Sequence, residues 1–293
     1  MKTTVKRLVS IIAAAAVATT MLAGCSDDDS ESGATGAITV ISREDGSGTR
    51  SAFIELTGIQ EEDEDGNKSD MTSSSALVSK STDAVLTQVS GDVNAIGYIS
   101  LGSLNDSVKA LKVEGVEVTA ENIKADEYAI ARPFNIATKG DISAQAQDFI
   151  TFILSADGQQ IVSDEGYVTI DDDAEAYEAA DVSGEIKIEG SSSVTPLMTK
   201  LKEAYEEINS DVSIEIQQTD SSSGMKTVAE EGCDIGMASR DLKDDEASEL
   251  DGITIARDGI AVIVNKNNDL EDISLETIKS IYVGDITEWE DVA

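Results

Sequence analysis

Residues 185–197 read EIKIEGSSSVTPL, a strand-like segment followed by a hydroxyl-rich turn. Apolar and polar side chains alternate over Glu185–Ile188, which predicts a β-strand with one buried face. The turn covers Ser191–Pro196, and Pro196 suits the first turn of a helix because its missing N–H costs no hydrogen bond there. The next segment, Thr199–Ile208, has apolar residues at helical spacing. This order of strand, turn and helix is typical of α/β proteins.

The same alternation continues on both sides of this segment. Short apolar or alternating runs predict strands at 37–42, 95–101, 212–216 and 260–264. Helical spacing predicts helices at 50–56, 83–89, 143–162 and 225–231, and Gly158 interrupts the third of these. The polar segments 61–70 and 171–184 have few large apolar side chains, and they are predicted to be a loop and an acidic linker. Repeated strand–helix units predict the α/β class for the whole chain.

The chain is strongly acidic. Its 293 residues include 58 Asp and Glu against 21 Lys and Arg, a formal net charge of −37. A charge of this size repels nucleic acid and anionic membrane surfaces, so nucleic acid is not expected as a partner. Any anion site must act locally, against the overall potential. The length is sufficient for two domains.

Residue types needed for several kinds of chemistry are missing. The chain has no His and only two Cys, Cys25 and Cys233. It therefore has no zinc-binding cluster, no Ser–His or Cys–His nucleophile and no disulfide framework, and we expect no metal and no cofactor. Cys233 is expected to pack as a small core residue. We do not expect an enzyme.

The N-terminus has the pattern of a lipoprotein signal peptide. Three basic residues precede the apolar, alanine-rich run 8–22, and Leu22-Ala23-Gly24-Cys25 resembles the bacterial lipobox. We expect a signal peptide over 1–24, diacylation of Cys25 and a flexible tether over 25–36, which would hold the protein at the extracytoplasmic face of the cell membrane. An ordinary signal peptide and a short membrane anchor are the alternatives, although the apolar run is short for a membrane span.

Three loops share one design, in which a strand leads through a Ser/Thr/Gly-rich turn into a helix: Gly46–Thr49, Gly190–Ser193 and Ser221–Gly224. A helix N-terminus offers free N–H groups and a partial positive charge, and hydroxyls add further donors, so such loops can cradle an anion. Ser and Thr are also the ordinary N-cap residues, so one loop alone is weak support. Arg43, just ahead of the first loop, adds a planar fork that suits an oxyanion or, alternatively, the neighbouring Asp45. No nucleotide-binding Gly-x-x-x-x-Gly-Lys-Ser/Thr motif is present in the sequence.

Three longer segments resemble one family. The segments SREDGSGTR at 42–50, GSSSVTPL at 190–197 and DIGMASR at 234–240 are similar to parts of the PstS family, the phosphate-binding subunits of ABC importers. The resemblance covers nearly all of 37–292 apart from the linker. It implies a monomeric extracytoplasmic protein that captures inorganic phosphate and passes it to the membrane permease subunits of a phosphate ABC transporter.

The resemblance also implies a fold. Family members have a type II periplasmic-binding-protein fold, in which two α/β domains joined by two crossover strands enclose a ligand cleft. Here the half with SREDGSGTR precedes the half with GSSSVTPL, the reverse of the usual order, which predicts a circular permutation with Gly36 and Ala293 close together. One domain would comprise 37–131 and 266–293, and the other 132–264. The crossovers would lie near 129–136 and 262–265.

Site residues follow from the same resemblance. Ser192, Ser193 and Ser221 match serines of the family's first and second phosphate-binding turns. Arg43, Ser47, Gly48 and Thr49 match the loop from the other domain, and Asp45 matches a carboxylate expected to orient the arginine.

Ser239 departs from the family pattern. Some members have an Asp at this position, and a carboxylate there accepts the proton of phosphate and repels sulfate, which carries none. Another oxyanion (sulfate, molybdate or a phosphonate) is therefore an alternative ligand. A surface protein that signals or adheres is an alternative of a different class. An enzyme acting on phosphate esters is disfavoured, because such sites usually need a metal or an equivalent clamp.

Overall fold

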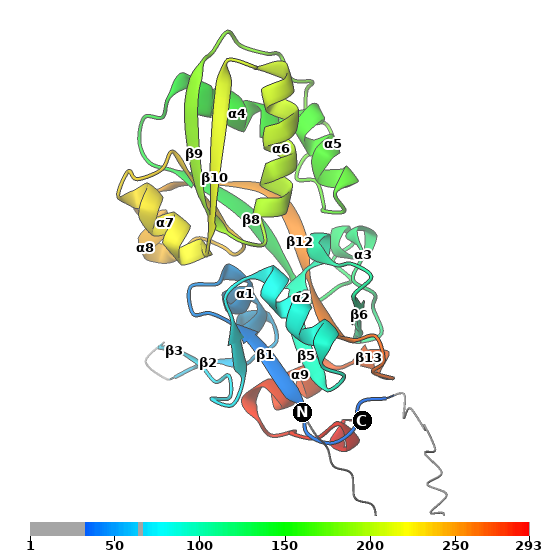
Figure 1. Cartoon of the computed structure of the whole chain (residues 1–293). Coiled ribbons are helices and arrows are strands. Elements are labelled where there is room, and N and C mark those ends of the chain that lie inside the picture. The colour runs from blue at the N-terminus through cyan, green and yellow to red at the C-terminus, as the bar shows by residue number, and fades with distance from the viewer. Residues whose placement is uncertain (1–32, 64–66, 293) are drawn as a thin grey trace, which may run out of the picture. The chain divides into compact units, whose positions relative to one another are not determined.

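Two long strands, β8 (Ala131–Thr138) and β12 (Asp251–Asn265), form the middle of a nine-stranded sheet (Figure 1). This computed structural model describes residues 33–63 and 67–292. The strand order is β10-β9-β11-β8-β12-β5-β1-β4, and β6 also pairs with β12. β8 and β12 are antiparallel from the pair Asp251–Thr138 to the pair Gly259–Ala131. β8 and β12 therefore join the strands on one side of the sheet (β9, β10, β11) to those on the other side (β1, β4, β5). The predicted α/β class is confirmed.

One group of elements surrounds what we call the second core and a smaller apolar cluster that includes Met225 and Val228. Its strands and helices are β9 (Gly184–Ser191), β10 (Val212–Thr219), β11 (Ile235–Ala238), α4 (Ala144–Leu154), α5 (Ala156–Asp164), α6 (Thr195–Ile208), α7 (Ser221–Ala229) and α8 (Asp244–Ala247). β9 pairs in parallel with both β10 and β11. Apolar side chains from the predicted helical stripes, such as Phe149 and Leu201, are fully buried in this core. We refer to this group as the second lobe.

The other group surrounds the first core and forms the first lobe. Its elements are β1 (Thr39–Arg43), β4 (Leu77–Ser79), β5 (Ala95–Ser100), β6 (Val108–Ala110), α1 (Gly48–Leu56), α2 (Thr82–Gly91), α3 (Ala120–Lys124), α9 (Leu275–Val283), η1 (Leu101–Ser103) and η2 (Trp289–Asp291). Two small sheets complete it: β2 (Gln60–Glu62) with β3 (Lys68–Asp70), and β7 (Lys112–Val113) with β13 (Asp272–Ile273). In the core, the rings of Phe53 and Tyr98 stack with their centroids 3.9 Å apart. β1 pairs in parallel with β4 and β5, so this lobe also contains the expected strand–helix units.

The two cores meet along the crossing strands. On β8 the first core ends at Ala131 and the second begins at Phe134, within the crossover predicted near 129–136. On β12 the change falls between Ala256 and Ile260, ahead of the predicted crossover near 262–265. The reason is the strand register: Asp258 lies opposite Arg132, so both strands change core at the same level. Residues 260–264, which we assigned to the second domain, therefore pack in the first core, while the division into two domains stays a prediction.

The predicted helix 143–162 is two helices. Ser155 ends α4 and begins α5, and its Oγ accepts a hydrogen bond from the Gly158 N–H at 3.3 Å. A Cβ on Gly158 would lie 2.2 Å from the Phe152 carbonyl oxygen, so only glycine fits this sharp junction. The polar segment 61–70 is also more ordered than expected, because parts of it form the β2–β3 pair.

The beginning and end of the described chain lie together. The Gly36 N–H donates to the Glu290 carboxylate at 2.9 Å, and the Trp289 N–H donates to the Gly36 carbonyl oxygen at 2.9 Å. The predicted proximity of Gly36 to the chain end is confirmed as far as Glu290. Ala293, the signal peptide and Cys25 lie outside the described residues, and the circular permutation itself stays a prediction. Within the described ranges, no helix is both long enough and apolar enough to cross a bilayer.

Candidate anion-binding site

Four loops at the ends of parallel strands build the site. They follow β1, β9, β10 and β4, and they lead into the N-termini of α1, α6, α7 and α2. The carboxyl ends of parallel strands are the usual place for ligands in α/β proteins. The first three loops are the ones predicted from the sequence. Seven of the predicted side chains or backbones in them are buried: Arg43, Ser47, Gly48, Thr49, Ser192, Ser193 and Ser221.

Arg43 is the only arginine in these loops, and it is 1% exposed. Its Nε and Nη2 donate to the two carboxylate oxygens of Glu44 at 2.9 and 2.8 Å. Nη2 also donates to Ser192 Oγ at 3.0 Å, which links the first lobe to the second. Nη1 is buried and has no hydrogen-bond partner. An unpaired buried guanidinium N–H is costly, so this nitrogen would gain from an additional acceptor.

Hydroxyl groups from both lobes lie beside Arg43. Thr49 Oγ1 and Ser193 Oγ are 2.8 Å apart. Ser191 Oγ donates to Ser239 Oγ at 2.9 Å, and the Ser239 N–H donates to Ser221 Oγ at 3.1 Å. Ser239 therefore holds the second-lobe serines in place.

The side chains of Ser193 and Ser221 do not cap the helices that follow them, so they are available for other contacts. α7 is capped by the Asp220 side chain rather than by Ser221, and the N-cap of α6 is Val194, which offers no side-chain acceptor. Ser47 is different, because its Oγ caps α1 by accepting from the Arg50 N–H at 3.3 Å. Capping thus explains Ser47 but does not explain Ser221 or Ser193.

Glycines allow the two lobes to approach closely. A Cβ on Gly48 would lie 2.4 Å from Ser221 Oγ and 2.8 Å from Ser239 Oγ. Next to it, the Ser222 N–H donates to the Gly46 carbonyl oxygen at 3.1 Å. Any side chain at Gly48 would push the first-lobe loop away from the second-lobe serines.

Asp45 does not orient Arg43, which corrects the sequence-based expectation. Its carboxylate accepts from Arg50 Nη1 at 2.8 Å, and its side chain is 97% exposed. Glu44, one position earlier, makes the expected contact with Arg43. Arg50 reaches back from α1 to the Arg43 carbonyl oxygen at 2.7 Å, which places it beside Asp45 and away from Glu44.

Thr82, the first residue of α2, was missed in the sequence. Its Oγ1 lies 3.4 Å from Ser192 Oγ and 3.3 Å from Ser193 Oγ, across the two lobes. The signal was present, since Ser79-Lys80-Ser81-Thr82 is a hydroxyl-rich turn between a strand and a helix, as in the three predicted loops.

A buried ion pair on the crossing strands lies behind the site. Arg132 donates to Asp258 at 3.0 Å and to the Ser239 carbonyl oxygen at 3.0 Å. Asp258 also accepts from the Ser100 hydroxyl at 2.9 Å, on the first-lobe side. Burial raises the pKa of Asp258 to about 6, against the opposing effect of Arg132. The pair thus joins the first lobe to the loop that carries Ser239.

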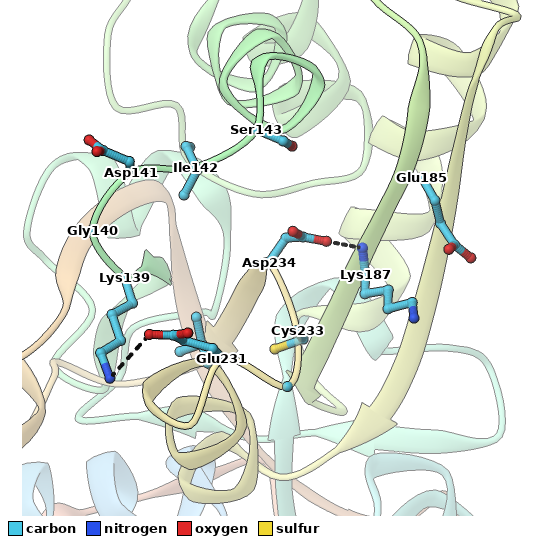
Figure 2. Close-up of a pocket in the computed structure, with 12 residues that line it drawn as sticks. Lys139, Gly140, Asp141, Ile142, Ser143, Glu185, Lys187, Glu231, Cys233 and Asp234 are labelled. Atoms are coloured by element: carbon cyan, nitrogen blue, oxygen red, sulfur yellow. Dashed lines mark hydrogen bonds and ion pairs between the residues drawn. The ribbon is translucent and has the colours of Figure 1, made fainter.

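A separate hollow of 630 Å³ lies elsewhere on the second lobe (Figure 2). In it, Lys139 is 4.0 Å from Glu231, and Asp234 accepts from the Lys187 backbone N–H at 2.7 Å. None of its lining residues contributes an unpartnered buried polar side-chain atom. Cys233 lies here, and burial together with Glu189 and Asp234 raises the pKa of its thiol to about 11. The thiol is therefore protonated at neutral pH, and this hollow lacks the prepared donors of the four loops.

The four loops offer donors and a fixed positive charge, so they can bind an oxyanion reversibly. In the described parts of the chain, no group of three or more His, Cys, Asp or Glu side chains is arranged to hold a metal ion.

Comparisons with known proteins agree with this fold. The model of the PBP superfamily domain matches residues 15–157 and 175–293, which defines the class of protein. "Phosphate-binding protein PstS 2" of Streptococcus agalactiae serotype V is 51% identical over 275 residues, 93% of each chain. The protein of the same name from Streptococcus pneumoniae serotype 4 is 44% identical over 263 residues, 90% of each chain. The chain therefore belongs to the PstS family within the PBP superfamily.

A solved structure supports the fold. The crystal structure of a phosphate ABC transporter, phosphate-binding protein from S. pneumoniae TIGR4 superimposes with a TM-score of 0.71 at 44% sequence identity. The match covers 88% of this chain and 100% of that chain. The long collinear alignments also mean that these streptococcal relatives share the order of segments found here.

Proposed function

We propose that this protein captures inorganic phosphate outside the cytoplasm and delivers it to the membrane permease of an ABC importer. The observation that carries the proposal is the unpartnered Nη1 of buried Arg43 beside hydroxyls from both lobes. An oxyanion bound there would accept from Arg43 and from Ser192, Ser193, Ser221 and Thr49, with Gly48 admitting it close to the backbone. Membership of the PstS family and the names of the streptococcal relatives favour phosphate as this oxyanion.

Binding of this kind needs no chemical step. All the contacts are hydrogen bonds and charge pairing, which form and break without a covalent intermediate. A transport receptor needs such reversibility, and an enzyme acting on phosphate esters would need groups to activate water or a nucleophile. The proposal also includes that the protein works as a monomer and that its two domains close on the ligand.

Anchoring at the membrane rests on the lipobox-like segment before Cys25. Diacylation of Cys25 would keep the protein at the outer face of the membrane, near the permease. Fractionation of cells that express Cys25→Ala tests this, because the variant should leave the membrane fraction. Retention of the variant in that fraction would contradict lipid anchoring at Cys25.

Titration calorimetry on residues 26–293, freed of bound anions, tests phosphate binding. Every residue of the first and second cores lies within 34–292, so this chain keeps both cores. We expect one phosphate per chain, and affinity lowered roughly ten- to hundredfold in Arg43→Ala, because a hydrogen bond to a charged group contributes about 1.5–3 kcal/mol. A parallel titration with sulfate measures the selectivity.

Arg257→Ala is the matched control. The Arg257 guanidinium pairs with the exposed Asp126 at 2.6 Å, away from the hydroxyl cluster, so this variant should bind like the wild type. Tight binding of sulfate or molybdate instead of phosphate would keep the site and reassign its ligand. A wild-type chain that binds no oxyanion would overturn the proposal.

A further inference from the structure

We propose that Thr82 is a direct ligand of the bound oxyanion, supplied by a fourth loop of the site. The inference rests on the proposed function and adds the β4–α2 loop to the three loops recognised in the sequence. Thr82 opens α2 directly after its N-cap, Ser81, and the Thr82 residue is 3% exposed. The chain thereby places a hydroxyl from the first lobe against the serines of the second lobe.

The Thr82 hydroxyl has no good hydrogen bond within the protein. Hydroxyl–hydroxyl bonds are commonly about 2.7–2.8 Å long. Thr49 and Ser193 meet this value at 2.8 Å, whereas Thr82 Oγ1 is 3.4 Å from Ser192 Oγ and 3.3 Å from Ser193 Oγ. A buried hydroxyl held at such distances gains from an additional acceptor.

Helix capping does not explain this hydroxyl. Ser81 caps α2, since its Oγ accepts from the Ala84 N–H at 3.2 Å. Thr82 Oγ1 is therefore not engaged in the cap, and it is free to donate across the lobes. The ten-residue helix adds the favourable end of its dipole for an anion at the same place.

A second group independently indicates a ligand at this point. Arg43 Nη2 donates to Ser192 Oγ, the same hydroxyl that lies 3.4 Å from Thr82 Oγ1. The other terminal nitrogen of that guanidinium, Nη1, is buried and unpartnered. A tetrahedral oxyanion offers four oxygens, so one ion can accept from Arg43, from the two serines and from Thr82.

Titration of residues 26–293 with inorganic phosphate tests the role of Thr82. Thr82→Val removes the hydroxyl and keeps the shape, and we expect it to bind phosphate about tenfold more weakly, since tenfold corresponds to about 1.4 kcal/mol, close to the contribution of one hydrogen bond to a charged group. Thr82→Ser restores the hydroxyl and should recover most of this loss. Thr87→Val is the matched control, because Thr87 lies on the same helix and its hydroxyl bonds only to the Asp83 carbonyl oxygen at 2.9 Å on the exposed side.

Urea unfolding without phosphate separates a ligand from a structural role. A ligand role predicts that Thr82→Val unfolds at the wild-type midpoint without phosphate and gains less stability from added phosphate. If Thr82→Val binds within twofold of the wild type while Arg43→Ala does not bind, Thr82 is no ligand and the proposed function stands. If Thr82→Val is destabilised without phosphate and Thr82→Ser does not recover binding, the hydroxyl is structural and the inference is wrong. A wild-type chain that binds no phosphate overturns the proposed function and this inference together.

Discussion

Arg43 is held by the side chain next to it in the sequence. Glu44 occupies Nε and shares Nη2 with Ser192, which leaves Nη1 as the one unpartnered nitrogen of a rigid guanidinium. Because Glu44 and Ser192 hold one side of the planar Arg43 guanidinium, Nη1 on the other side points in a fixed direction. Little side-chain entropy is therefore lost when a ligand binds. Asp45 takes no part in this arrangement, because its carboxylate pairs with Arg50 at the surface.

Two similar substitutions, at Glu44 and at Asp45, should therefore lower phosphate affinity to different extents. Glu44→Gln replaces one acceptor oxygen by an NH₂ group that faces an arginine donor, so we expect phosphate affinity to fall about tenfold. Asp45→Asn breaks only an exposed pair, worth about 0–1 kcal/mol, and should change the affinity by less than about fivefold. Calorimetry on the two variants measures both effects. Equal losses in both variants, or a larger loss in Asp45→Asn, would contradict the orienting role of Glu44.

The residues of three loops could be predicted from the sequence, and their detailed pairing could not. A run of Gly, Ser and Thr between a predicted strand and a predicted helix indicates a loop that can bind an anion. The choice between Glu44 and Asp45 depends on the direction of Arg50, three residues after the N-cap of α1, and no local pattern gives that direction. Thr82 was missed because its turn has no glycine and its contacts are made across the lobes, 110 and 111 residues away in sequence.

At the scale of elements, the segment 171–184 is anchored at Tyr177. We predicted a linker from its acidic, small side chains. In the structure, Tyr177 OH donates to Asp148 at 2.5 Å and accepts from Asn209 Nδ2 at 2.7 Å. Its ring meets the edge of Phe152 with centroids 5.2 Å apart. Tyr177 thus attaches the segment to the second lobe, together with the Glu175 carbonyl oxygen, which accepts from the Ala156 N–H at 2.8 Å, and composition alone does not predict these contacts.

This anchor predicts a graded loss of stability. Tyr177→Phe removes the hydroxyl while Asp148 keeps its bond from Tyr205 at 2.8 Å, so the free energy of unfolding should fall by about 1 kcal/mol. Tyr177→Ala also removes the ring from Phe152 and should cost about 3 kcal/mol. Urea unfolding measures both values, with the exposed neighbour Glu178→Ala as the control. Changes below 0.5 kcal/mol in both Tyr177 variants, on the usual scale for surface substitutions, would show that the segment is not attached there in solution.

For the whole molecule, the two crossing strands decide how the lobes are joined. The resemblance to the PstS family predicts two such strands. The point along them at which both strands pass from one core to the other is set by their register, which places Asp258 opposite Arg132. The contacts of Gly36 with Trp289 and Glu290 show why a permuted order of halves is structurally possible, since the two ends already meet. The order is shared with the streptococcal relatives, so a permutation would be common to this branch of the family.

The Arg132–Asp258 pair makes stability depend on pH in a definite direction. Burial raises the pKa of Asp258 from 3.8 to about 6 in the folded chain. Between these two values the folded state binds more protons than the unfolded state, so the stability that Asp258 contributes is full below pH 3.8 and is lost as the pH rises through 6. The many other carboxylates also affect this range, but they are the same in a chain that differs only at position 258.

We therefore compare the wild type with Asp258→Asn, which keeps the shape of the protonated acid. The difference in unfolding free energy, wild type minus variant, should fall by about 1.5 kcal/mol between about pH 5 and 7.5, because one unit of pKa corresponds to about 1.4 kcal/mol. Urea unfolding at the two pH values measures it. A difference that rises with pH would mean that Arg132 outweighs burial and that Asp258 ionises below its ordinary pKa. In that case the pair would stabilise the junction of the lobes at neutral pH, and acid rather than base would loosen the contact between Arg132 and the Ser239 loop.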